Sequence, residues 1–232
     1  MSVETLTGRA PIENKGTRQK WDVDGVARRF RGTTVVSHVV PESPMWLAQR
    51  RIYRDLIERG VSRDYGMLPP SSFHMTVIEG LKTRDLGDRW PAWLDDAEDF
   101  PDAVWQMVGR LREARIPKPA ALNLEVTGLE DLRNYVKLEL EPSDEETLKE
   151  LTAFREAVAE TLEIDFPGLD TYRFHSSMAY RLTQAGDDAA LIDDLHDTYL
   201  GWVKEIGRID LEDPAFCIFD DMLAFAPLYR FR

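Results

Sequence analysis

The tetrapeptide Phe73-His74-Met75-Thr76 returns 101 residues later as Phe174-His175-Ser176-Ser177. Both tetrapeptides lie in segments that we predict to be strands, 72–78 and 172–182. Successive side chains of a strand point to opposite faces, so each histidine shares a face with the hydroxyl two positions further on. The sequence therefore predicts two strands that each present one imidazole beside one hydroxyl, with apolar side chains on the opposite face.

The same offset aligns more of the chain without a gap. It places Pro41 on Pro142 and Leu47 on Leu148, so a strand, a proline, a helix and a histidine strand occur twice in the same order. A repeat of this length indicates a duplicated structural unit. We therefore expect two α/β units related by a pseudo-twofold axis.

Hydrophobic periodicity and turn residues predict the remaining elements. The predicted fold is α+β, a duplicated bilobal unit in which two mainly antiparallel sheets line a central cleft and the helices lie outside. Residues 1–32 are predicted to be an irregular N-terminal leader, and 33–232 a single domain with lobes of about 33–127 and 128–232. Strands are expected at 33–40, 121–127, 134–140, 216–219 and 223–229 as well, and helices at 45–59, 101–115, 143–162 (with Ser143 as N-cap) and 187–206.

Composition excludes several classes of protein. The 232 residues carry a formal net charge of −13, which disfavours a protein that coats long nucleic acid. The single cysteine, Cys217, leaves no partner for a disulfide and no cysteine-rich metal site. The sequence shows neither a secretory signal nor a membrane-spanning stretch. We expect a cytoplasmic protein that does not bind membranes and needs no cofactor.

The two histidines and two hydroxyls suit a phosphodiester without a metal ion. An imidazole with a pKa near 6.5 accepts or donates a proton around neutral pH, so one histidine can activate the attacking oxygen while the other protonates the leaving oxygen. Hydroxyls at Thr76 and Ser177 can donate hydrogen bonds to the non-bridging oxygens. Neither half supplies all four groups alone.

These paired His-x-Thr/Ser motifs resemble those of the 2H phosphoesterase superfamily, over roughly residues 33–230. The resemblance implies two lobes with a central cleft, and activity on 2',3'-cyclic phosphates or related nucleotide and RNA-end phosphodiesters. It assigns His74 and His175 as the acid/base pair, with Thr76 and Ser177 as phosphate ligands. The partner it implies is a small nucleotide or an RNA terminus with a cyclic phosphate. The sequence leaves the oligomeric state open.

Four further residues are candidates for substrate contact. Arg173 and Arg181 alternate onto the face of His175, so either could meet a phosphate, although Arg173 fits a surface ion pair equally well. Tyr135 and Lys137 share one face of the predicted strand 134–140 and could provide a stacking surface and an anion contact. An exposed sheet face explains that pair as well.

The other two histidines are expected to play structural roles. His38 lies in a predicted strand and has no histidine partner at the repeat offset, where Glu139 stands instead. His196 begins a His-x-Thr triplet, but in a predicted helix, where residues two apart do not share a face. A metal-dependent phosphohydrolase is disfavoured because too few histidines remain as ligands.

The segment after the first motif is about 15 residues longer than its counterpart, and the extra residues lie within 81–100. This insertion is interpreted either as a lid beside the cleft or as a surface loop. An acidic lid would favour a short or mononucleotide substrate. Its aromatic and acidic residues are Trp90, Trp93, Asp95, Asp96, Glu98 and Asp99.

Two functions from different classes follow. The favoured one is a metal-independent phosphodiesterase, and the alternative is a nucleotide or RNA-end binding module that uses the same cleft without turnover. A bell-shaped pH profile of the rate would distinguish the enzyme from the binder.

Overall fold

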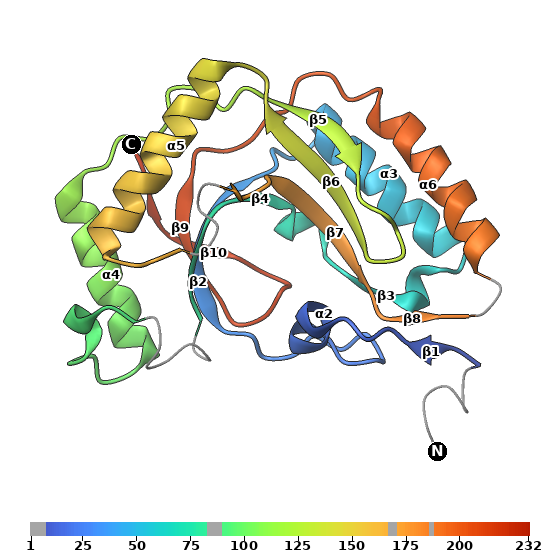
Figure 1. Ribbon diagram of the computed structural model, residues 1–232, viewed down its shortest axis with the longest axis horizontal. Helices are drawn as coiled ribbons and strands as arrows, with labels where there is room; N and C mark the ends of the chain where they lie inside the picture. Colours follow the sequence, from blue (N-terminus) through green and yellow to red (C-terminus); the bar gives the residue numbers. More distant parts are fainter. Residues whose placement is uncertain (1–7, 83–89, 167–170, 186–187) are drawn as a thin grey trace.

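The computed structural model describes residues 8–82, 90–166, 171–185 and 188–232. Strands lie in the middle of the molecule and helices on its outside (Figure 1). In chain order the elements are β1 (Ala10–Pro11), α2 (Lys15–Lys20), β2 (Gly32–His38), α3 (Pro44–Glu58), β3 (Tyr65–Met67), β4 (His74–Lys82), α4 (Phe100–Ala114), β5 (Leu124–Leu129), β6 (Tyr135–Pro142), α5 (Glu145–Leu162), β7 (His175–Arg181), β8 (Thr183–Gln184), α6 (Ala189–Val203), β9 (Ala215–Phe219) and β10 (Ala226–Arg230).

The main sheet consists of two four-stranded antiparallel halves. The first half has the order β10-β9-β2-β4, and the second has β7-β6-β5 with β3 on the free edge of β7. The halves meet where β4 and β7 pair at a single position, Met75 opposite Ser176. This arrangement confirms the predicted α+β class, with mainly antiparallel sheets and outer helices.

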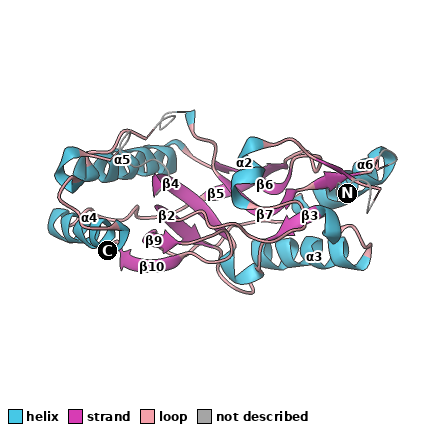
Figure 2. Cartoon of the chain, turned by 90° about the horizontal axis from the view of Figure 1, so that it is seen from below, coloured by secondary structure: helices cyan, strands magenta, loops and turns pink. Residues whose placement is uncertain are grey.

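The two halves of the fold exchange elements of the chain. Strands β9 and β10 come late in the sequence but pair with β2, whereas β3 comes early and pairs with β7. The helices do the same, since α3 packs against α6 and α4 packs against α5 (Figure 2). The segments 33–127 and 128–232 therefore each contribute strands to both halves of the sheet.

Side-chain caps fix where the helices begin. Ser43 caps α3 by accepting from the amide of Trp46, and Asp99 caps α4 in the same way. The N-cap of α5 is Asp144 rather than the predicted Ser143, because the carboxylate accepts from the Thr147 amide while the serine hydroxyl donates to a backbone carbonyl. The predicted helix end near residue 60 is confirmed by Gly60, whose φ of +72° suits a glycine.

The described part of the N-terminal segment, residues 8–32, contains regular elements, which differs from the irregular leader expected there. Strand β1 pairs with β8, and Asn14 caps the short helix α2. Trp21 is 2% exposed, and its ring lies so close to Gly66 that a Cβ there would be 2.4 Å from it. A helix of six residues is too short to show a hydrophobic period, so sequence patterning does not reveal it.

Charged groups also bind the N-terminal segment to the second half of the fold. Arg9 forms ion pairs with Asp64 and Asp188, and Arg18 donates to the carbonyl of Leu182. Because these contacts join residues far apart in sequence, the segment is part of the folded domain. Across the helices that the structure describes, none is long and apolar enough to cross a membrane.

We expect Trp21→Ala to destabilise the protein by about 3–5 kcal/mol, because it empties a packed aromatic site that holds the N-terminal segment on β3. Trp105→Ala is the matched control, since Trp105 is 57% exposed, and its effect should stay within about 0.5 kcal/mol. Urea denaturation followed by circular dichroism measures both. Equal effects of the two substitutions would show that Trp21 does not anchor the segment.

Candidate active site

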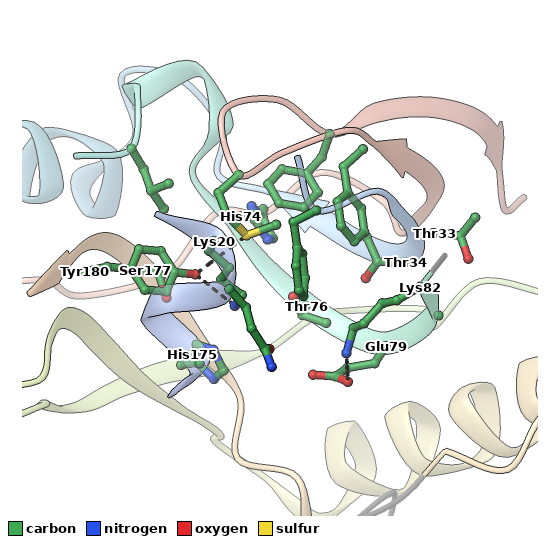
Figure 3. Close-up of a pocket in the computed structure, with 18 of the residues that line it drawn as sticks. Lys20, Thr33, Thr34, His74, Thr76, Glu79, Lys82, His175, Ser177 and Tyr180 are labelled. Atoms are coloured by element: carbon green, nitrogen blue, oxygen red, sulfur yellow. Dashed lines mark hydrogen bonds and ion pairs between the residues drawn. The ribbon is translucent and has the colours of Figure 1, made fainter. Parts of the chain in front are cut away.

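The two His-x-Thr/Ser motifs meet where β4 and β7 pair. Continuing the antiparallel register by one residue on either side of the Met75–Ser176 pair places His74 opposite Ser177, and Thr76 opposite His175. Residues opposite each other on antiparallel strands share a face of the sheet. The register thus puts the four side chains on one face of the sheet, and all four line one cavity (Figure 3).

The opposite face of this crossing belongs to the core. Phe73 and Met75 are buried, as is Phe174 on the second strand. Ser176 is the polar exception, and its hydroxyl accepts a hydrogen bond of 2.9 Å from Gln49 of α3. Core packing behind the sheet thus holds the four polar groups in place on its front.

Backbone carbonyls orient both imidazoles. Nδ1 of His74 lies 2.6 Å from the carbonyl oxygen of Ser72, and Nδ1 of His175 lies 2.9 Å from that of Arg173. A carbonyl oxygen only accepts, so Nδ1 must carry the proton and Nε2 is left as the acceptor. In both motifs the carbonyl belongs to the residue two positions before the histidine. The two copies of the motif therefore hold their imidazoles in the same tautomer.

Burial keeps both histidines uncharged at neutral pH. Burial is the main cause that lowers the pKa of His74 to about 4; the hydrogen bond to the Ser72 carbonyl opposes it, and nearby positive charges, including Lys20, add smaller contributions in the same direction as burial. Burial also lowers the pKa of His175, with smaller contributions from Lys137 and Lys20. In the free protein, each ring is therefore held as a neutral imidazole that can accept a proton.

The cavity has a volume of about 290 Å³, and the four motif residues and Lys20 are part of its lining. Its aromatic end begins beside His74, where Phe225 packs against the His74 ring at a centroid distance of 4.1 Å and against Phe219 at 5.2 Å. The cavity is also lined by Gly16, Gln19, Phe30, Thr33, Thr34, Leu68, Glu79, Gly80, Lys82, Tyr172, Tyr180 and Met222.

Sequence reasoning did not find Lys20 or the aromatic end of the cavity. Lys20 comes from the N-terminal helix, and Phe219 and Phe225 come from β9 and the loop before β10. These segments reach the site only through the exchange of elements between the halves. None of these residues belongs to a recognisable sequence motif. The only signal in the sequence is that two phenylalanines, Phe219 and Phe225, lie six residues apart.

The two arginine candidates lie outside this cavity. The Arg173 side chain is exposed, and the residue contributes its carbonyl oxygen to the His175 ring. Arg181 is 2% exposed and donates to the Tyr65 hydroxyl, the Thr183 carbonyl and the Asp188 carboxylate. The Arg181 guanidinium therefore forms its hydrogen bonds with protein groups rather than facing the cavity.

The pair on β6 also lies beside the cavity rather than in its lining. Lys137 is opposite Ser177 in the register, and its ammonium forms an ion pair of 2.9 Å with Glu130. The Tyr135 hydroxyl accepts from Asn14, and its ring packs edge-on against Tyr180. Both residues thus contact the elements that surround the site.

The remaining two histidines lie in the elements predicted for them, His38 in a strand and His196 in a helix. His38 is opposite His74 on β2, with ring centroids 6.2 Å apart, and Glu139 is opposite His175 at the equivalent position. His196 lies on α6, where its Nε2 is 3.2 Å from a backbone carbonyl oxygen. Within the described part of the chain, no three His, Cys, Asp or Glu side chains form a group that could hold a metal ion.

The insertion is described only in part, because residues 83–89 lie outside the described residues. Trp93 donates to the carbonyl of Leu162 at 3.0 Å, and Trp90 packs against Phe100. Asp99 is the N-cap of α4. None of residues 90–100 lines the cavity, and the lid remains a prediction.

The sequence model of a family named 2H-phosphodiest, described as a domain of unknown function (DUF1868), matches residues 20–134. The match includes the first motif, and the structure pairs that motif with its second copy. The family model and the paired motifs together show that the chain is similar to the 2H phosphoesterase superfamily. No curated protein matches it significantly.

Two solved structures resemble this 2H phosphoesterase-like chain. The conserved protein of unknown function ATU0111 from Agrobacterium tumefaciens str. C58 has a TM-score of 0.81 and 24% identity, over 96% of this chain and 94% of that chain. At that identity the likeness shows a shared fold. The protein TT0787 of Thermus thermophilus has a TM-score of 0.43 and 16% identity, over 86% of this chain and 96% of that chain.

The lowered pKa of His74 predicts how stability depends on pH. Its folded pKa of about 4 lies below the usual value, so the unfolded chain binds the proton more readily, and stability present above about pH 6.5 is lost as the pH falls toward 4. Between pH 7 and pH 4, the wild type should lose about 3 kcal/mol more than His74→Gln. Urea denaturation across this range measures the difference, with His196→Gln as control. Parallel curves for wild type and His74→Gln would contradict the assigned pKa.

Proposed function

We propose that this protein is a metal-independent phosphodiesterase that hydrolyses 2',3'-cyclic phosphates of nucleotides or RNA ends. The observation that carries the proposal is the crossing of β4 and β7, where two neutral imidazoles and two hydroxyls line one cavity. The match of residues 20–134 to the 2H-phosphodiest family model supports the same chemistry.

The proposed reaction uses the two imidazoles in opposite senses. The histidine next to the attacking water accepts its proton at Nε2 as the oxygen bonds to phosphorus. The other histidine, protonated beforehand, donates its Nε2 proton to the ribose oxygen as the P–O bond of the ring breaks. The proton count is unchanged overall, and the direction in which the substrate lies decides which of His74 and His175 is the base.

The hydroxyls of Thr76 and Ser177 complete the site. Each lies opposite a histidine, so a phosphorus atom between the rings would place its non-bridging oxygens near both hydroxyls. Donors fixed by a rigid sheet stabilise the charge that develops on those oxygens without reorganisation. The aromatic end of the cavity, with Phe219 and Phe225 next to His74, offers a stacking surface for a nucleobase.

A binding module without turnover is the second candidate. One observation favours it: both histidines are kept neutral, whereas the reaction needs one of them protonated. A bound phosphodiester anion favours the protonated imidazole and works against this effect. The two candidates are therefore separated by measuring turnover below neutral pH.

The decisive experiment is turnover of 2',3'-cyclic mononucleotides and short RNAs with cyclic-phosphate ends, in EDTA. His74→Ala and His175→Ala should each lower kcat by at least about a hundredfold, because each removes a proton-transfer group. His196→Ala is the control, since His196 lies on α6 and not in the cavity. Binding of these ligands without turnover by the wild type would support the binding module.

We expect kcat/KM to follow a bell-shaped curve with its maximum on the acidic side of neutrality. The acidic limb should lie near pH 4, the pKa of His74, and the alkaline limb below about pH 6.5, because burial lowers the pKa of His175. Initial rates from pH 3.5 to 8 with a cyclic mononucleotide check this, within the range where circular dichroism shows a folded protein. A maximum above pH 7.5 would contradict the assignment.

A further inference from the structure

The N-terminal helix α2 covers the cavity that holds the paired motifs. Gly16, Gln19 and Lys20 of this helix line it, and in Figure 1 the helix lies beneath the junction of the two halves of the sheet. Asn14 donates to Tyr135 next to the helix, and Trp21 packs on Gly66 at its end. The helix is thus fixed over the site by contacts on both of its sides.

Lys20 brings a positive charge into the cavity without a negative partner. Its ammonium donates to the Tyr180 hydroxyl at 3.4 Å and lies 5.0 Å and 5.6 Å from the ring centroids of Tyr180 and Phe30. All of these groups are neutral. Among the residues that the structure describes, no carboxylate oxygen lies within 4 Å of this ammonium, whereas the other cavity lysine, Lys82, is paired with Glu79 at 2.8 Å.

A partly buried cation without a counter-charge indicates an anion site. Removing an ammonium from water costs free energy unless an opposite charge compensates it. The charge of Lys20 acts on both catalytic candidates, since it contributes to the lowered pKa of His74 and of His175. An anion held between the two imidazoles would therefore lie within the electrostatic reach of Lys20 (Figure 3).

We propose that Lys20 binds the non-bridging oxygens of the substrate's phosphoryl group, and that α2 closes the cavity so that a single nucleotide fills it. The cavity of about 290 Å³ lies just below the usual range for small-molecule sites, so it is large enough for at most one nucleotide. The reaction catalysed on that nucleotide rests on the proposed function, whereas the anion site at Lys20 does not.

Lys20→Met tests the anion site, because it keeps the packing of the side-chain stem and removes the charge. Lys15→Met is the matched control: it makes the same change at an exposed position of the same helix that does not line the cavity. The probes are inorganic phosphate and adenosine 3'-monophosphate, measured by isothermal titration calorimetry in EDTA at neutral pH. Urea denaturation of each variant reports its stability.

We expect Lys20→Met to weaken the binding of both probes by about ten- to a hundredfold, the range for a hydrogen bond to a charged group, with Lys15→Met within about twofold of wild type. Lys20→Arg should restore most of the affinity. Unchanged affinity in Lys20→Met overturns the proposal. So does a wild type that binds neither probe, or a binding loss matched by loss of the folded state.

A second pair of probes tests whether helix α2 limits the size of the ligand. Adenosine 3'-monophosphate should bind at least about tenfold more tightly than a decaribonucleotide with a 3'-phosphate, because α2 and the net charge of −13 both exclude the longer anion. Equal affinities would overturn the size limit.

Phosphate binding that depends on Lys20, with no turnover of any ester, would support the anion site and reject the phosphodiesterase. Turnover that Lys20→Met leaves unchanged would support the phosphodiesterase and reject the anion site at Lys20.

Discussion

The site depends on one backbone pairing, Met75 opposite Ser176, at which the two halves of the sheet join. Continuing the antiparallel register by one residue on either side of this pair places each histidine opposite the hydroxyl of the other motif. A shift by one residue would turn the imidazoles into the core. The buried faces on either side of the pair, with Phe73 and Phe174, make such a shift unfavourable.

The exchange of elements between the halves explains why the site is enclosed. The chain returns with β9 and β10 to extend the first half, and the N-terminal segment lies against the second half. Residues from both ends of the sequence thus line the same cavity as the motifs in the middle. This enclosure also provides the desolvation that lowers the pKa of both histidines.

The duplicated motif carried most of what the sequence could predict. Alternation along two strands placed His74 and His175 on the faces that line the cavity, because local geometry alone determines that outcome. It could not place Arg181, since a strand face does not reveal that Asp188 and Tyr65 occupy its guanidinium. It also missed Lys20, whose helix is held at the cavity by contacts with residues far away in the sequence, among them the packing of Trp21 on Gly66.

Net charge and local charge act on different scales in this protein. The net charge of −13 repels a polyanion, and ionic screening limits this repulsion to about 10 Å from the protein. The cavity is lined by the ammonium groups of Lys20 and Lys82 and by one carboxylate, Glu79, which forms its ion pair with Lys82. A small anion that reaches the cavity therefore meets a positive field beside two neutral imidazoles. Its negative charge favours protonation of one of them, so the bound anion itself would create the acid that the empty site lacks.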